Sequence, residues 1–410
     1  MTPIRISNGM LIAMIVNLIF VKSIGLTQGT LARIVTQDMW IATVLGTLQG
    51  LVIMYVTYLA MRRSPRLDFI ALGERLAGKW FSVLVALLIF VFFLAGSGPI
   101  MMAFVYHLLD YFLPEAPLPV FLVAALLVGM LGCFYGVEVM ARSALIGLVF
   151  LFALNVLIII GSTQEFDIRN LLPVMESGLP RNLNASLHYD ADWALGTMLA
   201  ALIMPMMKDP GKNGGKIGML GIAASGMMIV IWAILEGAVL SAEVTGQYTL
   251  SCMKLARNAH IGNFLQRYEM IMIALYALPS LFEIMFCVYG ISVSASRIFG
   301  MKSNKAMIPV SAVLIGAFDY WLLKDHYRAL DFMEHQWLYI ALPIAFGLPL
   351  LMLAMRLMLG KKLANAQAAG GGQGQQRPGS VKDMQPSDKG KQPEPAGSTA
   401  DGADGGKAYK

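Results

Sequence analysis

The sequence predicts an all-α membrane protein of ten transmembrane helices, built as two inverted sets of five. Of its 410 residues, 57% are hydrophobic and only 14% are charged, and the mean hydropathy of +0.65 is well above that of ordinary soluble domains. Ten apolar stretches have about the 20 residues that a helix needs to cross a bilayer. A long polar stretch separates five of them from the other five. Because five is odd, the second set enters the membrane from the opposite side.

The expected spans divide one membrane domain, residues 1–362, into two repeats. They lie near residues 8–34, 39–61, 80–109, 117–135, 137–161, 191–207, 217–241, 269–296, 306–323 and 336–359. The first repeat covers 8–161, an outer loop covers 162–190, and the second repeat covers 191–359. Over 363–410 the composition changes to Gly, Gln, Pro, Ser and Lys, which cannot bury enough apolar surface to fold. We therefore expect a disordered cytoplasmic tail there.

Charges in the loops predict the orientation of the chain in the membrane. The loops after spans two, six and eight are basic, with Arg62, Arg63, Arg66, Arg75, Lys79, Lys208, Lys212, Lys216, Arg297, Lys302 and Lys305. The opposite loops are acidic, with Asp110, Glu115, Glu165, Asp167, Glu176, Asp190 and Asp192. Because basic loops stay in the cytoplasm, we expect both termini to be cytoplasmic. The net charge of +6 then reflects topology, and we expect no nucleic-acid partner.

Two of the expected helices are irregular, and they occupy matching positions in the two repeats. Near the middle of the first span stand Lys22, Ser23 and Gly25, and a charge at that depth costs about 2.5–3.5 kcal/mol on insertion scales. The sixth span is short, contains Gly196 and runs into Pro205. Interrupted helices in corresponding places of inverted repeats indicate a transporter-type binding site.

Residues at similar depth predict a pocket beside Lys22. At roughly 1.5 Å per helical residue, Lys22, Ser97, Leu199 and Tyr276 fall near one level of the membrane. Two interpretations of Lys22 are open. In the first, its fixed positive charge receives a substrate carboxylate or replaces a coupling cation. In the second, its ammonium group extends to the outer interface. Ser97 and Gly98 either admit a ligand or let two helices approach closely.

Other charged residues within the spans have structural or functional interpretations. Glu283 is expected too near the cytoplasmic side to touch Lys22. It is either a proton-responsive group in a water-filled pathway or a structural acid. Glu138 and Arg142 stand four residues apart on one helix, and this spacing predicts a structural ion pair.

Three motifs give the chain a resemblance to a known family. They are Gln37-Asp38-Met39-Trp40-Ile41 at the start of span two, Gly136-Val137-Glu138 with Arg142 at the start of span five, and Asn170-Leu171-Leu172-Pro173-Val174 with Gly178 in the outer loop. In order and spacing they resemble the spore germination permeases, which are the GerAB-like B subunits of nutrient germinant receptors. The resemblance extends over about residues 4–360 and excludes the tail.

This resemblance implies a fold, a location and partners. The family belongs to the amino acid/polyamine/organocation superfamily, whose members have a LeuT-like five-plus-five inverted repeat. It implies a protein of the spore inner membrane of an endospore-forming bacterium, acting with receptor A and C subunits on a small nutrient such as an amino acid. Where the family commonly has a Gly-x-Gly break, this chain has Val21-Lys22-Ser23, which indicates an altered ligand preference. The candidate ligand-binding residues are Val21, Lys22, Ser23, Gly25, Ser97, Gly98, Leu199 and Tyr276.

The favoured function is therefore a germinant-receptor membrane subunit that binds a nutrient and triggers spore germination. The alternatives are a proton-coupled or facilitative amino acid transporter and a structural membrane scaffold. The sequence contains no phosphate-binding loop, nucleophile triad or set of metal-ligand spacings. We accordingly expect neither enzymatic activity nor a cofactor.

Overall fold

The computed structural model describes residues 6–262 and 268–371, and every named element in this part of the chain is a helix. The long helices are α1 (Asn8–Lys22), α3 (Met39–Met61), α5 (Lys79–Tyr111), α6 (Leu118–Tyr135), α7 (Val137–Ser162), α8 (Gly178–Ile203), α9 (Pro210–Leu240), α12 (Tyr268–Ile298), α13 (Met307–Leu323) and α15 (Trp337–Gly371). Shorter ones are α2 (Gln28–Val35), α4 (Phe69–Ala77), α10 (Ala242–Gln247), α11 (Ser251–Asn258) and α14 (His326–Asp331). Two π-helical segments, η1 (Ser23–Thr27) and η5 (Phe332–Gln336), and three 3-10 turns, η2 (Thr36–Asp38), η3 (Ile168–Leu171) and η4 (Met204–Met206), complete the described chain.

Ten helical passes follow from the lengths of these elements. In the described residues, seven helical stretches are long and apolar enough to cross a membrane. The first of them, Asn8–Met61, has 54 residues, which at about 1.5 Å per residue is more than twice the apolar thickness of a bilayer. It crosses twice, because the chain reverses at Thr36, where φ is 50°. The helices α8 and α13 provide the remaining two passes.

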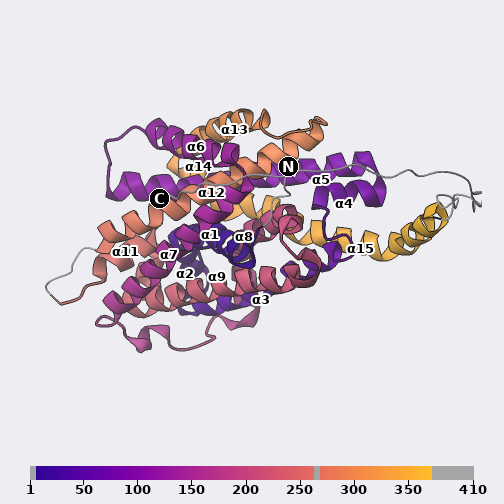
Figure 1. Cartoon of the computed structure of the whole chain (residues 1–410). Coiled ribbons are helices and arrows are strands. Elements are labelled where there is room, and N and C mark those ends of the chain that lie inside the picture. Colours follow the sequence, from indigo (N-terminus) through magenta and orange to yellow (C-terminus); the bar gives the residue numbers. More distant parts are fainter. Residues whose placement is uncertain (1–5, 263–267, 372–410) are drawn as a thin grey trace, which may run out of the picture. The chain divides into compact units, whose positions relative to one another are not determined.

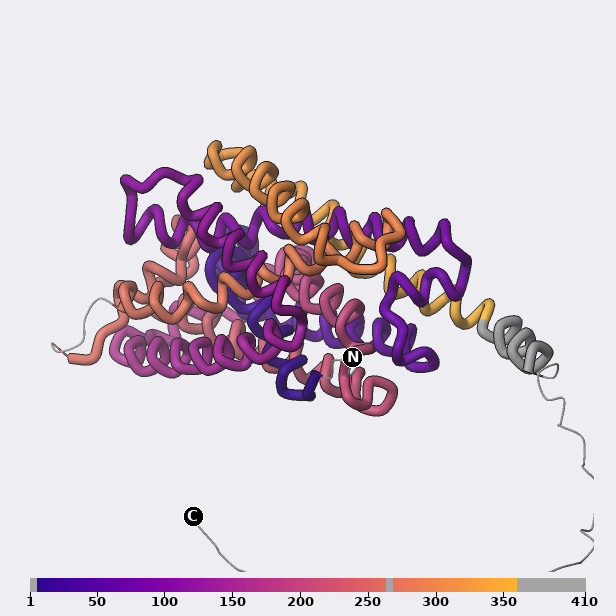
Figure 2. Tube along the Cα trace, turned by 45° about the horizontal axis from the view of Figure 1, so that its top comes forward, coloured from indigo at the N-terminus to yellow at the C-terminus, as the bar shows by residue number. Residues whose placement is uncertain are grey.

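Helix α1 lies in the middle of the bundle. It packs against α7, α8, α9 and α12, and Figure 1 shows it together with α2 and α8 among the surrounding helices. From Leu11 to Lys22 nearly every side chain is buried, as expected of a helix that is apolar all round. Figure 2 follows the same trace from a second direction, with the first helix in indigo inside the bundle. We call the end of the bundle where Asn8 begins the terminal end, and the end that carries residues 163–177 the loop end.

Helix α8 begins earlier than the sequence predicted. The expected outer loop ran to residue 190, but α8 starts at Gly178. Its loop-end half contains Asn182, Ser186, Asp190 and Asp192, and the side chains of all four are fully buried. The prediction was wrong because polar residues that face the inside of a bundle resemble loop residues in a hydropathy reading.

Two further expectations, on the loops between spans and on the start of the tail, differ from the structure. The short helices α4, α10 and α11 occupy segments that were read as loops. One compact unit ends at Lys361, but helix α15 continues to Gly371, so the first residues of the expected tail are helical. The rest of the expected disordered tail, 372–410, lies outside the described residues.

Two of the three sequence motifs meet at the loop end. The buried carboxylate of Asp38 accepts hydrogen bonds from the backbone N–H groups of Met175 (2.7 Å) and Ser177 (2.8 Å). Gln37 donates to the carbonyl of Pro173 at 3.2 Å, and Asn170 donates to a carbonyl of α9 at 2.8 Å. These contacts fix residues 168–177 on η2 and α9 and set the position from which α8 starts.

The third motif contains the predicted ion pair. Arg142 Nη2 lies 2.5 Å from Glu138 Oε1, one helical turn away on α7. Both side chains are exposed, so this pair contributes little to stability, about 1 kcal/mol at most.

Candidate functional site: a charged cluster at the π-helical segment

A buried ion pair joins the irregular part of the first span to α8. Lys22 is the last residue of α1, and its ammonium group contacts Asp192 Oδ1. The side chain of Lys22 is 3% exposed and that of Asp192 is 0% exposed. Of the two interpretations of Lys22, extension of the ammonium group to the outer interface does not fit this geometry, because the lysine is neutralised inside the bundle.

Hydroxyl groups of the π-helical segment complete the surroundings of this pair. Ser23 Oγ and Thr27 Oγ1 donate to Asp192 Oδ2 at 2.7 and 2.6 Å, and Thr27 Oγ1 also accepts from Lys22 Nζ at 3.4 Å. Among the described residues, Lys22 thus has two side-chain partners for an ammonium group that carries three N–H donors. One donor remains for an acceptor that enters from outside the pair.

The first span does not unwind at this point but widens into a π-helix. Such segments contain one extra residue per turn and often occur at functional sites. The carbonyl of Val21, just before η1, accepts a hydrogen bond from Tyr276 Oη at 3.2 Å. The sixth span is also irregular, yet its 3-10 turn η4 comes after the end of α8 at Ile203, well beyond Asp192.

Glu283 of α12 belongs to the same cluster. Its Oε1 accepts the backbone N–H of Lys22 at 3.3 Å, and its Oε2 has no hydrogen-bond partner within the described part of the chain. The expectation that Glu283 lies too near the cytoplasmic side to touch Lys22 is therefore wrong. The depth estimate counted residues along straight helices and did not include the length of a side chain. It therefore missed a contact in which the carboxylate of Glu283 reaches the backbone of Lys22 and not its ammonium group.

Gly25 allows close packing around η1. A Cβ atom at this position would lie 3.0 Å from His107 Cε1 and 3.0 Å from Tyr276 Oη. The two rings stack with their centroids 4.2 Å apart, and His107 Nε2 lies 3.2 Å from the sulfur of Cys252 in α11. Gly25 is thus a contact between helices and is not among the residues that line the pocket described next.

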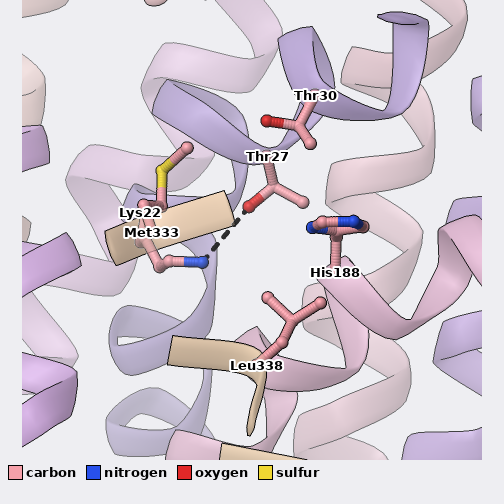
Figure 3. Close-up of a pocket in the computed structure, with 6 residues that line it drawn as sticks. All are labelled: Lys22, Thr27, Thr30, His188, Met333 and Leu338. Carbon is pink, nitrogen blue, oxygen red and sulfur yellow. Dashed lines mark hydrogen bonds between the residues drawn. The ribbon is translucent and has the colours of Figure 1, made fainter. Parts of the chain in front are cut away.

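A small pocket lies beside the ion pair on the side of α8 and α15. It is lined by Lys22, Thr27, Thr30, His188, Met333 and Leu338. Figure 3 shows the hydroxyl of Thr27 directed toward the lysine, with His188 and Leu338 on the opposite wall. The cavity volume is about 10 Å³, enough for about one water molecule. Small-molecule sites have roughly 300–1,000 Å³, so the pocket must widen to receive a ligand.

A larger cavity adjoins this pocket between α8 and η5–α15. We call it the vestibule; its volume is about 390 Å³, and it is lined by Asn184, Leu187, His188, Glu334, His335, Leu338, Tyr339, Leu342 and Pro343. His188 and Leu338 line both cavities. These two side chains therefore form the partition between the vestibule and the pocket.

The loop end of the pocket is closed by a second ion pair. Arg33 Nη2 of α2 contacts Glu334 Oε1 of η5, and both groups bond Thr30 Oγ1, at 3.0 and 3.3 Å. Arg33 also donates to the carbonyl of Gly246 in α10 at 3.1 Å. This pair is partly exposed, unlike Lys22 and Asp192, and it ties the first span, the last span and the short helix α10 together above the pocket.

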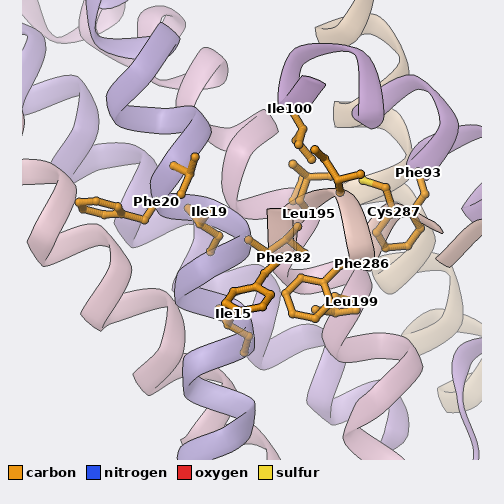
Figure 4. Close-up of a cluster of buried hydrophobic side chains, with 14 of the residues drawn as sticks. Ile15, Ile19, Phe20, Phe93, Ile100, Leu195, Leu199, Phe282, Phe286 and Cys287 are labelled. Atoms are coloured by element: carbon orange, nitrogen blue, oxygen red, sulfur yellow. The ribbon is translucent and has the colours of Figure 1, made fainter. Parts of the chain in front are cut away.

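Toward the terminal end the pocket is closed by apolar side chains. Figure 4 shows Ile15 and Ile19 of α1 among leucines of α8 and phenylalanines of α12. Leu199, a candidate ligand residue, lies in this layer and is fully buried in the apolar core. It was placed beside Lys22 because span six was counted from residue 191. The actual partner, Asp192, stands seven residues earlier, about two helical turns.

Ser97 and Gly98 are not brought together with Lys22. Ser97 Oγ donates to Asp319 Oδ1 of α13 at 3.0 Å, and a Cβ at Gly98 would meet Leu322 of α13 at 2.6 Å. Helix α5 continues through Pro99 without a break. Of the two interpretations that the sequence left open, close approach of helices is the one that this geometry fits.

Apart from the apolar Met333 and Leu338, sequence reasoning missed the polar residues Asp192, Thr27, Thr30 and His188 at the pocket. The two threonines follow Lys22 at positions that a widened helix turns toward α8 and α15, but no residue type marks a π-helix in advance. His188 and Asp192 were assigned to the loop and its boundary. A signal was present in their spacing of four residues, which places them on one face of a helix.

The described helices form a LeuT-like membrane fold, as two solved structures show. Mhp1, a nucleobase-cation-symport-1 family transporter in a closed conformation with bromovinylhydantoin bound, is similar with a TM-score of 0.62 and 15% identity, over 78% of this chain and 74% of that one. MhsT in complex with L-phenylalanine gives a TM-score of 0.58 and 16% identity, over 88% and 91% of the two chains. At such identities the likeness establishes the fold alone.

The sequence comparisons are more specific. Residues 5–321 match the family described as Spore germination protein, and the chain belongs to this family. Spore germination protein KB of Bacillus subtilis (strain 168) is 26% identical over 317 residues, which are 74% of this chain and 81% of that protein. The family resemblance predicted from the three motifs is thereby confirmed.

Proposed function

We propose that the chain is the membrane subunit of a nutrient germinant receptor. It binds a small nutrient, such as an amino acid, at the pocket beside Lys22 and passes this occupancy to receptor A and C subunits, which triggers germination. The observation that carries the proposal is the buried Lys22–Asp192 pair at a π-helical segment, with one lysine N–H left for a ligand acceptor. Family membership supports the germination role, and L-phenylalanine bound to the similar MhsT supports the nutrient class.

The proposal includes a location and an orientation. The basic loops at the terminal end favour a cytoplasmic position for that end and for both termini, so the vestibule opens to the outer side of the spore inner membrane. The two repeats then comprise α1–α7 and α8–α15. A nutrient enters through the vestibule, passes the His188–Leu338 partition and biases the bundle between two arrangements.

Binding to the purified chain tests the pocket. Thermal unfolding in detergent should be screened against amino acids, sugars and nucleosides, since a ligand at 100 times its Kd stabilises by about 2.7 kcal/mol. Thr27→Val should remove most of this shift, because the hydroxyl positions both Lys22 and Asp192. Thr57→Val is the matched control: its buried hydroxyl bonds the carbonyl of Ile53 within α3. Equal losses in both variants, or an undiminished shift in Thr27→Val, would contradict the site.

Glu283 is proposed as the proton-responsive group of this site. It has Lys22 and Asp192 as charged neighbours, and one of its oxygens lacks a partner within the described chain. Glu283→Gln should flatten the pH dependence of nutrient binding by the purified protein. An unaltered pH profile would remove Glu283 from the proposal and leave the pocket itself in place.

A further inference from the structure

A basic groove lies at the terminal end of the bundle, between α3 and α15. Its volume is about 260 Å³, and it is lined by Leu59, Arg62, Arg63, Leu353, Arg356 and Leu357. Arg62 and Arg63 directly follow the last residue of α3, and Arg356 lies near Leu359, where the apolar stretch of the last span ends. The groove is therefore at the level of the membrane–water boundary.

Arg356 is buried in this groove without a full set of partners. Its side chain belongs to a residue that is only 8% exposed. One Nη donates to the carbonyl of Ala60, but Nε has no hydrogen-bond partner in the described part of the chain. A buried cation is costly unless it is paired and hydrogen-bonded, so this guanidinium calls for an anion.

No carboxylate of the described residues supplies that anion. Within 6–262 and 268–371, neither Arg62, Arg63 nor Arg356 forms an ion pair. The charged groups that lie close to Arg356 are Arg63 and Arg75, which repel it. Guanidinium groups match the geometry of phosphate oxygens and bind them in pairs of hydrogen bonds.

The rest of the groove is apolar and open. Leu59, Leu353 and Leu357 line the same cavity as the arginines, and Leu357 is 67% exposed. A free inorganic anion makes no use of such a surface, whereas a lipid places its phosphate on the arginines and its hydrocarbon along the leucines. Basic pockets between transmembrane helices are known to accept anionic headgroups.

We propose that this groove binds an anionic phospholipid of the leaflet at the terminal end. The lipid phosphate lies between Arg62, Arg63 and Arg356, and an acyl chain follows Leu353 and Leu357. Because Arg62 and Arg63 directly follow α3 and Arg356 belongs to α15, the lipid fastens the second span to the tenth. This site is separate from the nutrient pocket and goes beyond the proposed function.

The test uses the full chain in a neutral detergent. Phosphatidylglycerol, phosphatidylcholine or inorganic phosphate is added, and the unfolding temperature and the lipid retained in native mass spectrometry are measured. Phosphatidylglycerol should raise the unfolding temperature and stay bound, while the other two should not. Arg62→Gln with Arg63→Gln should weaken phosphatidylglycerol binding by about fivefold for each charge removed.

The matched control is Lys79→Gln with Lys302→Gln. These lysines are exposed and lie at the same end of the bundle, Lys79 at the start of α5 and Lys302 between α12 and α13, but they do not line the groove. This double variant should bind phosphatidylglycerol like the unaltered chain. Equal weakening in the two double variants would show diffuse charge attraction and overturn the site. Equal stabilisation by phosphatidylcholine or by inorganic phosphate would overturn the assignment to an anionic lipid.

Discussion

Lys22 is held inside the bundle by groups that come from two helices. Its ammonium group contacts Asp192, and the carboxylate of Asp192 is in turn bonded by Ser23 and Thr27. In a low-dielectric interior the two charges attract strongly, but each is costly when left alone. The pair therefore fixes the π-helical segment to α8 as long as both partners are present.

A double-mutant cycle tests this pairing. Lys22→Met and Asp192→Asn should each lower the free energy of unfolding by about 3–5 kcal/mol, because each leaves an uncompensated buried charge. The combined variant should lose clearly less than the sum. The exposed pair Glu138 and Arg142 gives the control cycle, with a coupling of about 0.2–1 kcal/mol. Additive losses at Lys22 and Asp192, measured by unfolding in detergent, would refute the pairing.

One half of this pair was predictable from the sequence and the other half was not. Lys22 is conspicuous because it stands in a long apolar stretch. Asp192 follows Asp190 and a polar segment, so its charge was counted with the loop. A buried acid in a polar helix face has no local signature, and only the packing of α8 against α1 identifies it.

At the level of elements, η1 depends on the space left by Gly25. The side chains of His107 and Tyr276 occupy the room that a Cβ atom would need. Tyr276 Oη also bonds the carbonyl of Val21. The shape of the first span is thus determined jointly by α5 and α12.

Gly25→Ala should therefore destabilise the protein. Overpacking of a well-packed core typically costs about 1–3 kcal/mol. This cost should exceed the stability that alanine gains over glycine from its higher helix propensity. Gly9→Ala is the control, because a Cβ there has its nearest neighbour 4.0 Å away; it should be neutral or stabilising. The unfolding temperatures of the two variants test this prediction. An equal change in unfolding temperature for Gly25→Ala and Gly9→Ala would argue against close packing at η1.

The sequence predicted most elements but not their irregular parts. Apolar length located the passes, because the bilayer imposes it. It misplaced the start of α8 and missed α4, α10 and α11, since hydropathy does not register buried polar faces or short helices between the spans. It indicated an irregular first span, but a lysine with small neighbours does not tell a π-helix from an unwound segment.

On the scale of the whole molecule, the pocket has unequal barriers toward the terminal end and toward the vestibule. A layer of apolar side chains from α1, α8 and α12 closes the terminal end (Figure 4). On the vestibule side, His188 and Leu338 alone line both cavities. Opening toward the vestibule therefore requires fewer side chains to move than opening toward the terminal end.

Leu338→Ala should open the partition. In a Thr30→Cys background, a small thiol reagent should modify the pocket cysteine faster when Leu338 is truncated, because Thr30 lines the pocket and is 4% exposed. The three native cysteines are buried, so the unaltered chain gives the background rate. Leu342→Ala, which lines only the vestibule, is the control. Equal labelling rates in the two alanine variants would mean that Leu338 is not a barrier.

The central claim is that the nutrient binds beside the Lys22–Asp192 pair. Electron cryo-microscopy of the full chain, with the nutrient identified by stabilisation screening, tests it most directly. We expect ligand density in contact with Lys22, Thr27 and His188, in a pocket wider than the present 10 Å³. Ligand density confined to the vestibule or elsewhere, with this pocket still closed, would contradict the claim.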